Sequence, residues 1–213
     1  MNKGGNGLSL KKTFVSLKPI DIFALVNLIL FFAMSYGIYF DRFIKYRGSA
    51  YIWEFFVYAF VIFALIIIGW RATRSFVNVS GWLLLMAQAG IIIHFVGGLA
   101  FWGNKRIYDV VIMGVRYDKY VHFFNAFVAG LFVRRISLEQ ILKRWWISDL
   151  ASILIVLGLG AIVEIVEYMV MLTVAVNGVG NYDNNMQDLI ANLAGVTLCI
   201  VAMRIVAKML PAV

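Results

Sequence analysis

The sequence is poor in the residues that mark several classes of protein. Among its 213 residues is one cysteine, Cys199, which excludes an internal disulfide and a thiolate metal cluster. Two prolines and the absence of an acidic or Ser/Pro-rich tract argue against a long disordered region. Charged residues make up only 14% of the chain, against about 25% in an average soluble domain. The chain also lacks the Ser-x-x-x-Lys, Gly-x-Ser-x-Gly and His-Glu-x-x-His arrangements of familiar hydrolases.

The sequence is instead rich in apolar residues. Hydrophobic residues make up 63% of the chain, and the mean hydropathy is +0.89. A soluble fold of this size could not bury so much apolar surface, so the excess must face lipid. The net charge of +8 is typical of loop lysines and arginines beside anionic lipid, and no basic stretch interleaved with exposed aromatics indicates a nucleic-acid partner.

A transmembrane helix needs about 20 mostly apolar residues. Six stretches meet this requirement, although the fourth is the most polar: residues 20–40, 53–70, 81–102, 118–134, 147–175 and 185–209. All six tryptophans lie at or near a predicted span end, where the indole ring prefers the membrane interface. The sequence therefore predicts an all-α fold, a polytopic transmembrane helical bundle of about six helices.

The positions of lysine and arginine predict the orientation of this bundle. With six spans both termini share one side of the membrane, and that side holds twelve of the 19 Lys and Arg residues. Positively charged loops favour the cytoplasm, so we place both termini there. We expect residues 1–19 to be a cytoplasmic segment and residues 20–209 to form a single transmembrane domain. The first apolar run lacks a small-x-small cleavage site, which favours a retained span over a signal peptide.

Ionisable residues inside the predicted spans are the most informative feature of the sequence. Each costs at least about 2.5–3.5 kcal/mol to place at the centre of a bilayer, so each needs a partner, water or a metal. These residues, with the polar side chains that accompany them, are His94, Asp118, His122, Asn125, Glu164, Glu167, Asp183, Asp188 and Asn192.

Their spacing is helical. Asp118 and His122 are four residues apart, Glu164 and Glu167 three, and Asp188 and Asn192 four, so each pair shares one helix face. At about 1.5 Å of rise per residue, the histidines and Glu and Asp residues of four spans fall in the outer half of the bilayer. This clustering predicts one polar site inside the bundle.

Several of these residues also have a simpler structural explanation. His94 alone could be a hydrogen-bonded core residue, and Asp118 and Asp183 could begin helices. Asp118 could pair with Arg116, Lys119 or a loop cation, and Asn184 with Gln187 could form a capping box. Glu164 and Glu167 are hardest to explain in this way, because two carboxylates one turn apart in apolar sequence resist joint ionisation without a cation.

The motifs resemble those of known membrane families. Three segments resemble the YjdF-like family of small bacterial inner-membrane proteins: RYDKYVHFF, the span containing Glu164 and Glu167, and YDNNMQDLIANLAG. The VanZ-like family is more distantly similar through the Asp118–His122 motif, an intramembrane Glu and the Asp188–Gly195 motif. The resemblance implies a multi-pass protein of the bacterial cytoplasmic membrane. It implies the position of a site rather than an activity, because VanZ-like members are associated with glycopeptide resistance without an established reaction.

Three functions compete on this evidence. In the first, a divalent metal (Zn, Mn, Mg or Fe) acts on a lipid or lipid-linked envelope substrate. Its ligands come from His94, Asp118, His122, Glu164, Glu167 and Asp188. The candidate catalytic residues are Glu164, Glu167 and Asp188. Asn125, Asp183 and Asn192 would support the site. In the second, the same groups carry protons or cations across the membrane. In the third, the protein binds an envelope ligand without catalysis.

Overall fold

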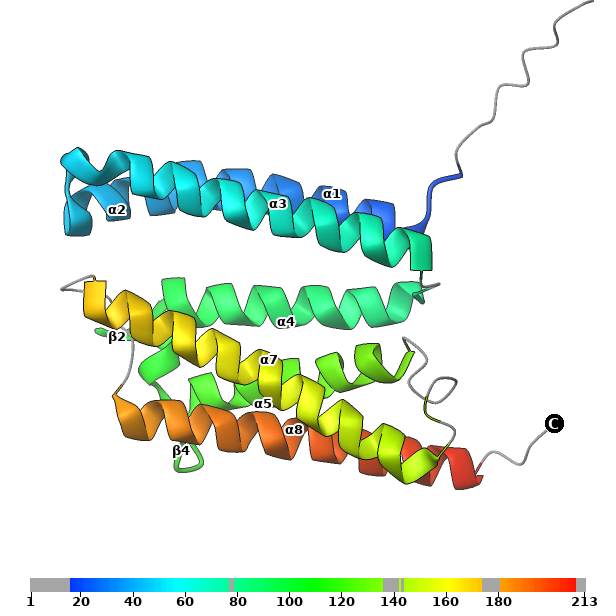
Figure 1. Ribbon diagram of the computed structural model, residues 1–213. Helices are drawn as coiled ribbons and strands as arrows, with labels where there is room; N and C mark the ends of the chain where they lie inside the picture. Colours follow the sequence, from blue (N-terminus) through cyan, green and yellow to red (C-terminus); the bar gives the residue numbers. More distant parts are fainter. Residues whose placement is uncertain (1–15, 77–78, 136–141, 143, 174–180, 210–213) are drawn as a thin grey trace, which may run out of the picture.

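A computed structural model describes residues 16–76, 79–135, 142, 144–173 and 181–209. The long helices are α1 (Pro19–Met34), α3 (Ile52–Phe76), α4 (Gly81–Leu99), α5 (Tyr117–Arg135), α7 (Trp145–Thr173) and α8 (Tyr182–Met209). A π-helical stretch, η1 (Ser35–Tyr39), joins α1 to α2 (Phe40–Arg47), so these three pieces form one rod. A short 3₁₀ helix, η2 (Ser49–Tyr51), turns the chain into α3. The fold is the predicted all-α bundle, with six long helical rods running roughly parallel or antiparallel (Figure 1).

The helices form two groups on either side of α4. The hairpin of α1 and α3 lies on one side, while α5, α7 and α8 lie on the other, with α7 crossing its neighbours at an angle (Figure 1). A buried apolar cluster ties the first hairpin to α4 and α5 through Ile20, Val79, Leu83, Leu84 and Val128. Helix α5 packs most extensively against α8 and also contacts α4 and α7. Helix α5 is therefore the central element of the second group.

The outer surface of the bundle is apolar, as lipid requires. On α3, Phe56, Phe60 and Ile68 are each more than half exposed, and similar residues cover α1 and α7. Five of the rods are long and apolar enough to cross a membrane by length and composition. Helix α5 is not among these five, in line with its polar sequence, yet it lies within the bundle and is shielded by its neighbours.

Helix α1 begins and α8 ends at the same end of the bundle, which we call the terminal end (Figure 1). The opposite end, where α4 ends and α5 begins, we call the distal end. The shared side of the termini agrees with an even number of crossings. Of the predicted segment 1–19, residues 1–15 lie outside the described part of the chain.

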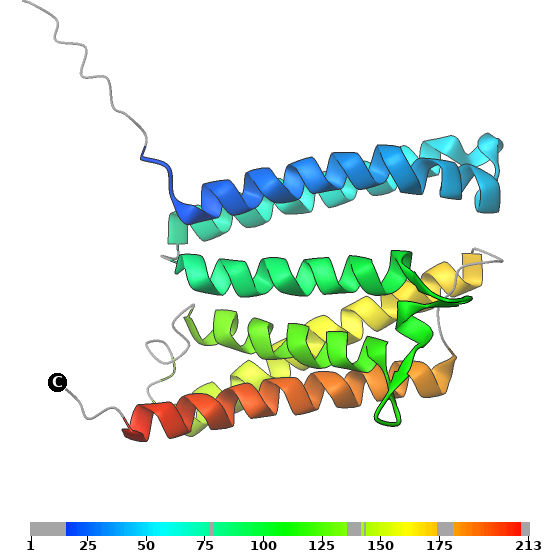
Figure 2. The same ribbon diagram turned by 180° about the vertical axis from the view of Figure 1, so that it is seen from behind.

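The connection between α4 and α5 contains structure that the hydropathy pattern did not predict. The predicted span 81–102 ends as a helix at Leu99, and two small antiparallel hairpins follow. They are β1 (Phe101–Trp102) with β2 (Lys105–Arg106), and β3 (Val111–Ile112) with β4 (Val115–Arg116), separated by the 3₁₀ helix η3 (Ile107–Asp109). Figure 2 shows this connection at the distal end, next to the start of α5. Two-residue strands carry too little periodicity to be recognised in a sequence.

Candidate functional site

Two glycines allow the helices that carry the site to approach closely. A Cβ added to Gly195 of α8 would collide with the backbone carbonyl of Phe123 on α5. A Cβ added to Gly160 of α7 would lie 2.6 Å from Nδ2 of Asn192 on α8. Small residues at such crossings are typical of membrane helices, because they let the backbones come together. The two contacts bring α5, α7 and α8 together beside the polar residues of each helix.

Three of the predicted ligands meet between these helices. One ligand atom from each of His122 (α5), Glu164 (α7) and Asp188 (α8) lies within 4.8 Å of the other two. His122 Nε2 and Asp188 Oδ1 are 3.4 Å apart. Ligands of a tetrahedral zinc ion lie about 3.3 Å from each other when the metal–ligand distance is about 2.0 Å. Small side-chain adjustments would therefore let all three residues bind one ion.

Lys119 provides a buried positive charge next to this cluster. Its Nζ lies 2.8 Å from Oδ1 of Asp188 and donates to the backbone and side-chain oxygens of Asn184 at 3.0 and 2.9 Å. Asn184 Nδ2 in turn donates to the other oxygen of Asp188 at 2.8 Å. The contacts fix the orientation of the Asp188 carboxylate and give it one compensating charge.

Glu164 differs from Asp188 because none of the described residues forms a hydrogen bond with its carboxyl group. The residue is only 6% exposed. Neither Oε1 nor Oε2 has a hydrogen-bond partner among the residues that the structure describes. Buried polar atoms are almost always paired, so two unpaired oxygens on one carboxyl group are a strong departure from the norm. A carboxylate in this position needs a proton or a cation.

Asp118 forms ion pairs at the start of α5. Its Oδ2 lies 3.2 Å from Nη2 of Arg116 and 3.2 Å from Nζ of Lys119. Arg116 also contacts Asp109 in η3 at 3.1 Å. The pairing with Arg116 and Lys119, which the sequence offered as the simpler explanation of Asp118, is present, and it gives Asp118 counter-ions in the protein itself.

The start of α8 departs from the expected capping box. The side-chain oxygen of Asn181 accepts a hydrogen bond from the backbone N–H of Asn184 at 3.0 Å, so Asn181 caps this end. Asn184 is buried and uses its side chain on Lys119 and Asp188, so the predicted Asn184–Gln187 box is wrong. Asp183 is exposed in the first turn of α8 and does not belong to the cluster of His122, Glu164 and Asp188.

A cavity of about 390 Å³ lies beside the cluster, between α4, α5, α7 and α8. Its polar lining residues are His94, His122, Asn125, Glu167 and Asn192. The rest of the lining is apolar and includes Ala129, Val156 and Leu159. Small-molecule sites commonly have volumes of about 300–1,000 Å³ and combine an apolar lining with a few polar groups. The cavity thus has the size and composition of a binding site.

His94 is held in place from the α4–α5 connection. The hydroxyl of Tyr108 is hydrogen-bonded to Nδ1 of His94, and the two rings meet edge to face with centroids 5.6 Å apart. The ring of Tyr108 also lies so close to Gly97 of α4 that a Cβ added to this glycine would collide with it. Burial raises the pKa of the Tyr108 phenol above its ordinary value, so the group keeps its proton in alkaline solution.

An apolar layer separates the cavity from the terminal end. Ala126, Val156 and Val196 form a buried cluster across α5, α7 and α8, with Val133 and Ile153 packed against it. Beyond this layer lies a second polar network, in which Asp149 binds Arg134 and Arg204, each at 2.8 Å. The two polar regions are therefore divided by closely packed apolar side chains.

Comparison with known proteins places this arrangement in a family. The family model described as "Predicted membrane protein (DUF2238)" matches residues 22–209 of the chain. The protein belongs to the DUF2238 family. This is the YjdF-like family expected from the motifs, whereas the VanZ-like similarity rests on the motif residues alone. No curated protein and no solved structure matches the chain significantly.

The predicted site residues of this DUF2238 protein take different positions. His122, Glu164 and Asp188 come together, while His94, Asn125, Glu167 and Asn192 line the adjacent cavity. Asp118 is ion-paired and Asp183 stands apart. Sequence reasoning missed the buried roles of Lys119, Asn184 and Tyr108. Lys119 follows Asp118 in the DKYVH motif and precedes His122 by three residues. This spacing puts Lys119 and His122 on the same face of the helix, so the sequence did contain a signal that Lys119 faces the site.

Proposed function

We propose that His122, Glu164 and Asp188 bind one divalent metal ion beside the intramembrane cavity. The observation that carries this proposal is the Glu164 carboxyl group, which is buried and has no hydrogen-bond partner among the described residues. Lys119 compensates Asp188, so an ionised Glu164 leaves one negative charge without a counter-ion in the cluster. A divalent cation supplies that counter-ion and uses the free oxygens as ligands.

The ligand set favours particular metals. One imidazole nitrogen and two carboxylates suit Zn, Mn or Fe, while Mg prefers oxygen ligands alone. We therefore rank Zn, Mn and Fe ahead of Mg.

The coordination of the loaded site predicts the chemistry of the ligand. Three protein ligands leave at least one coordination position of a divalent ion open. An anionic oxygen, such as that of a phosphate, is the kind of group that such an ion binds at an open position. The adjacent cavity is polar at His94, His122 and Glu167 and apolar toward Ala129 and Val156. This combination fits an amphipathic molecule, and we propose a lipid or lipid-linked envelope substrate.

A metal-dependent reaction on that substrate is the activity that these groups support best. A bound divalent ion polarises phosphoryl or ester oxygens and lowers the pKa of bound water. Glu167 and His94 line the cavity without belonging to the three-residue cluster, so they are placed to accept or donate protons at a ligand there. Tyr108 positions His94 for this role through its hydrogen bond.

Metal analysis of the purified protein tests this proposal. We expect one divalent ion per chain after dialysis against Zn²⁺ or Mn²⁺, with affinity reduced at least tenfold in Glu164→Gln. The matched control is Glu54→Gln, which removes the same charge from the Arg47–Glu54 pair on a different helix hairpin. Equal metal binding by the wild type and Glu164→Gln, or no binding by either, would contradict the proposal.

A protonated Glu164 is the alternative to a metal-bound one, and it would suit a proton-coupled carrier. The apolar layer of Ala126, Val156 and Val196 weighs against this function, because it blocks a polar route toward the terminal end. We therefore place transport second.

A further inference from the structure

A second cavity of the described bundle, larger than the one beside the metal cluster, lies away from that cluster. It has a volume of about 600 Å³ and lies between α1, η1, α3 and α4, with Phe132 of α5 at one side. Helix α4 is the wall between the two cavities: His94 lines the polar one, and the next residue, Phe95, lines this one. The two sites are thus separate, and a ligand in one is not explained by the other.

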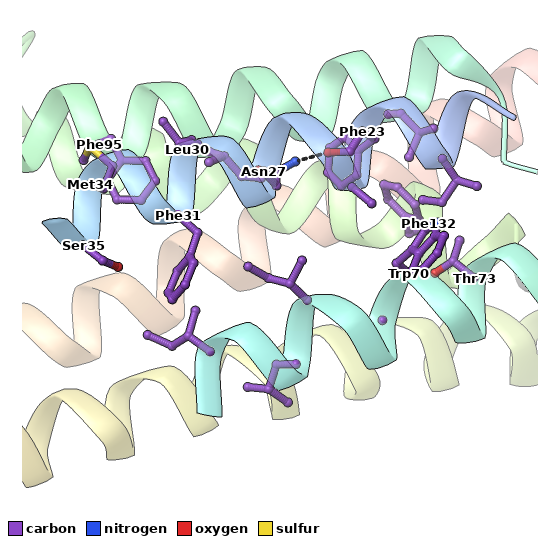
Figure 3. Close-up of a pocket in the computed structure, with 18 of the residues that line it drawn as sticks. Phe23, Asn27, Leu30, Phe31, Met34, Ser35, Trp70, Thr73, Phe95 and Phe132 are labelled. Atoms are coloured by element: carbon purple, nitrogen blue, oxygen red, sulfur yellow. Dashed lines mark hydrogen bonds between the residues drawn. The ribbon is translucent and has the colours of Figure 1, made fainter. Parts of the chain in front are cut away.

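The lining of this cavity is almost entirely hydrocarbon. Leu30, Phe31 and Leu65 are typical of it, and the few polar residues are Asn27, Ser35, Tyr39, Trp70 and Thr73. Figure 3 shows Ser35 and Thr73 near opposite ends of the cavity, with Leu30 and Phe31 between them. Two of these polar side chains are bound by the protein itself. Asn27 Nδ2 donates to Phe23 O and to Gln88 Oε1, each at 2.8 Å. The indole N–H of Trp70 donates to Asp21 at 2.8 Å.

An apolar space of this kind must be filled by apolar material. Water does not occupy cavities that lack polar partners. An empty space would deprive the surrounding side chains of dispersion contacts. The α1–α3 hairpin lies among membrane-spanning helices, so hydrocarbon chains of the bilayer are the apolar material that surrounds it.

The shape of the cavity fits an extended chain. Its lining on the first rod runs from Ile20 to Tyr39, a rise of about 28 Å at 1.5 Å per residue. The hydrocarbon of one leaflet is about 15 Å deep, half of the bilayer core. The cavity is therefore long enough to hold the acyl chain of a phospholipid along the helix axes.

We propose that this cavity is a binding site for one bilayer phospholipid, held by its acyl chain between the α1–α3 hairpin and α4. The proposal is independent of the metal cluster. The bound chain adds to the contacts between the hairpin and α4 that the protein makes itself, which include the buried cluster of Ile20, Leu83 and Leu84.

Gly69 offers a direct test, because it lines the cavity and an added Cβ there would meet nothing within 4 Å. Gly69→Phe would add a benzyl group at the wall of the cavity, and its Cβ would meet no protein atom. The matched control is Gly158→Phe: Gly158 is also an exposed glycine inside a long helix with nothing within 4 Å, and it lines neither cavity. Both variants add the same side chain to the same kind of position.

The experiment is native mass spectrometry of the full chain in a mild detergent with added palmitoyl-oleoyl-phosphatidylglycerol. We expect the wild type and Gly158→Phe to retain one phospholipid at collision energies that remove the detergent. Gly69→Phe should reduce the lipid-bound fraction at least fivefold. Gly69→Leu, which fills less space, should reduce it about twofold, and it decides the question if Gly69→Phe does not purify as a single species. Retention of the lipid by both Gly69 variants at the wild-type level, or its loss from all four proteins, overturns the proposal.

Discussion

The ammonium group of Lys119 lies 2.8 Å from Oδ1 of Asp188, and the side chains of both residues are almost fully buried. Lys119 belongs to the first turn of α5 and Asp188 to the second turn of α8, so this contact joins the two most closely packed helices of the bundle. It also decides the charge of the site, because it leaves Glu164 as the carboxyl group without a counter-ion within the cluster.

Lys119→Met should destabilise the metal-free protein strongly. Removing one member of a buried ion pair leaves the other charge uncompensated, at a cost of about 3–5 kcal/mol. The melting temperature should fall accordingly, and Zn²⁺ should restore more of it than in the wild type, because the cation replaces the lost charge beside Asp188. The measurement is thermal unfolding in detergent with and without Zn²⁺. Lys45→Met is the control, since Lys45 is exposed; a melting temperature of Lys119→Met equal to that of Lys45→Met would refute this account.

Gly195→Ala should lower stability, although alanine is the better helix former. The added Cβ would collide with the backbone carbonyl of Phe123, which cannot rotate away as a side chain would. Overpacking of this kind costs about 1–3 kcal/mol. Gly158→Ala has open space and should be neutral or stabilising by up to about 1 kcal/mol. Thermal unfolding of both variants checks the difference, and equal melting temperatures would show that α5 and α8 do not depend on this contact.

Asp149→Asn should destabilise the terminal end of the bundle. Asp149 accepts from Arg134 and from Arg204, with contacts of 2.8 Å to each, and Arg134 also donates to the buried Ser148 at 2.8 Å. Loss of the carboxylate weakens two charge-assisted contacts, which we expect to cost about 3 kcal/mol. Asp41→Asn, at an exposed position of α2, serves as the control. Unchanged thermal stability and an unchanged protease digestion pattern in Asp149→Asn would count against the network.

Proteoliposomes containing the wild type should show no flux of Mn²⁺, Zn²⁺ or protons above that of empty vesicles. The reason is the apolar layer of Ala126, Val156 and Val196, which separates the cavity from the Asp149 network. Fluorescent metal and pH indicators inside the vesicles provide the measurement. A flux that Glu164→Gln abolishes and Glu54→Gln preserves would favour the carrier function over the metal-dependent reaction.

Much of the fold could be predicted from the sequence, because lipid imposes a simple rule on each helix. The predicted span 118–134 corresponds to helix α5 (Tyr117–Arg135), and the predicted span 185–209 corresponds to helix α8 (Tyr182–Met209). Both were predicted in spite of the polar residues that they contain. The hairpins at 101–116 were missed, since their strands have two residues each. Hydropathy also gave no sign of the π-helical stretch Ser35–Tyr39.

The sequence predicted the candidate site less completely than it predicted the fold. Helical spacing placed the histidines and carboxylates on inward faces, and their position in the outer half of the bilayer predicted one polar site. Three members of the predicted set, His122, Glu164 and Asp188, meet in the structure. Spacing within one helix cannot say which groups on different helices pair, so the Lys119–Asp188 contact and the isolation of Glu164 were not foreseeable. The apolar cavity was equally hidden, because lining residues such as Leu30 and Leu65 resemble any lipid-facing residue in sequence.

X-ray absorption spectroscopy of the zinc-loaded protein tests the central claim most directly. The account predicts one zinc per chain with nitrogen and oxygen ligands at about 2.0–2.2 Å and the multiple-scattering signature of a single imidazole. The imidazole signature should disappear in His122→Ala and remain in His94→Ala. A spectrum of fully hydrated zinc, or an imidazole signal that persists in His122→Ala, would contradict the assignment of His122, Glu164 and Asp188 as the metal ligands.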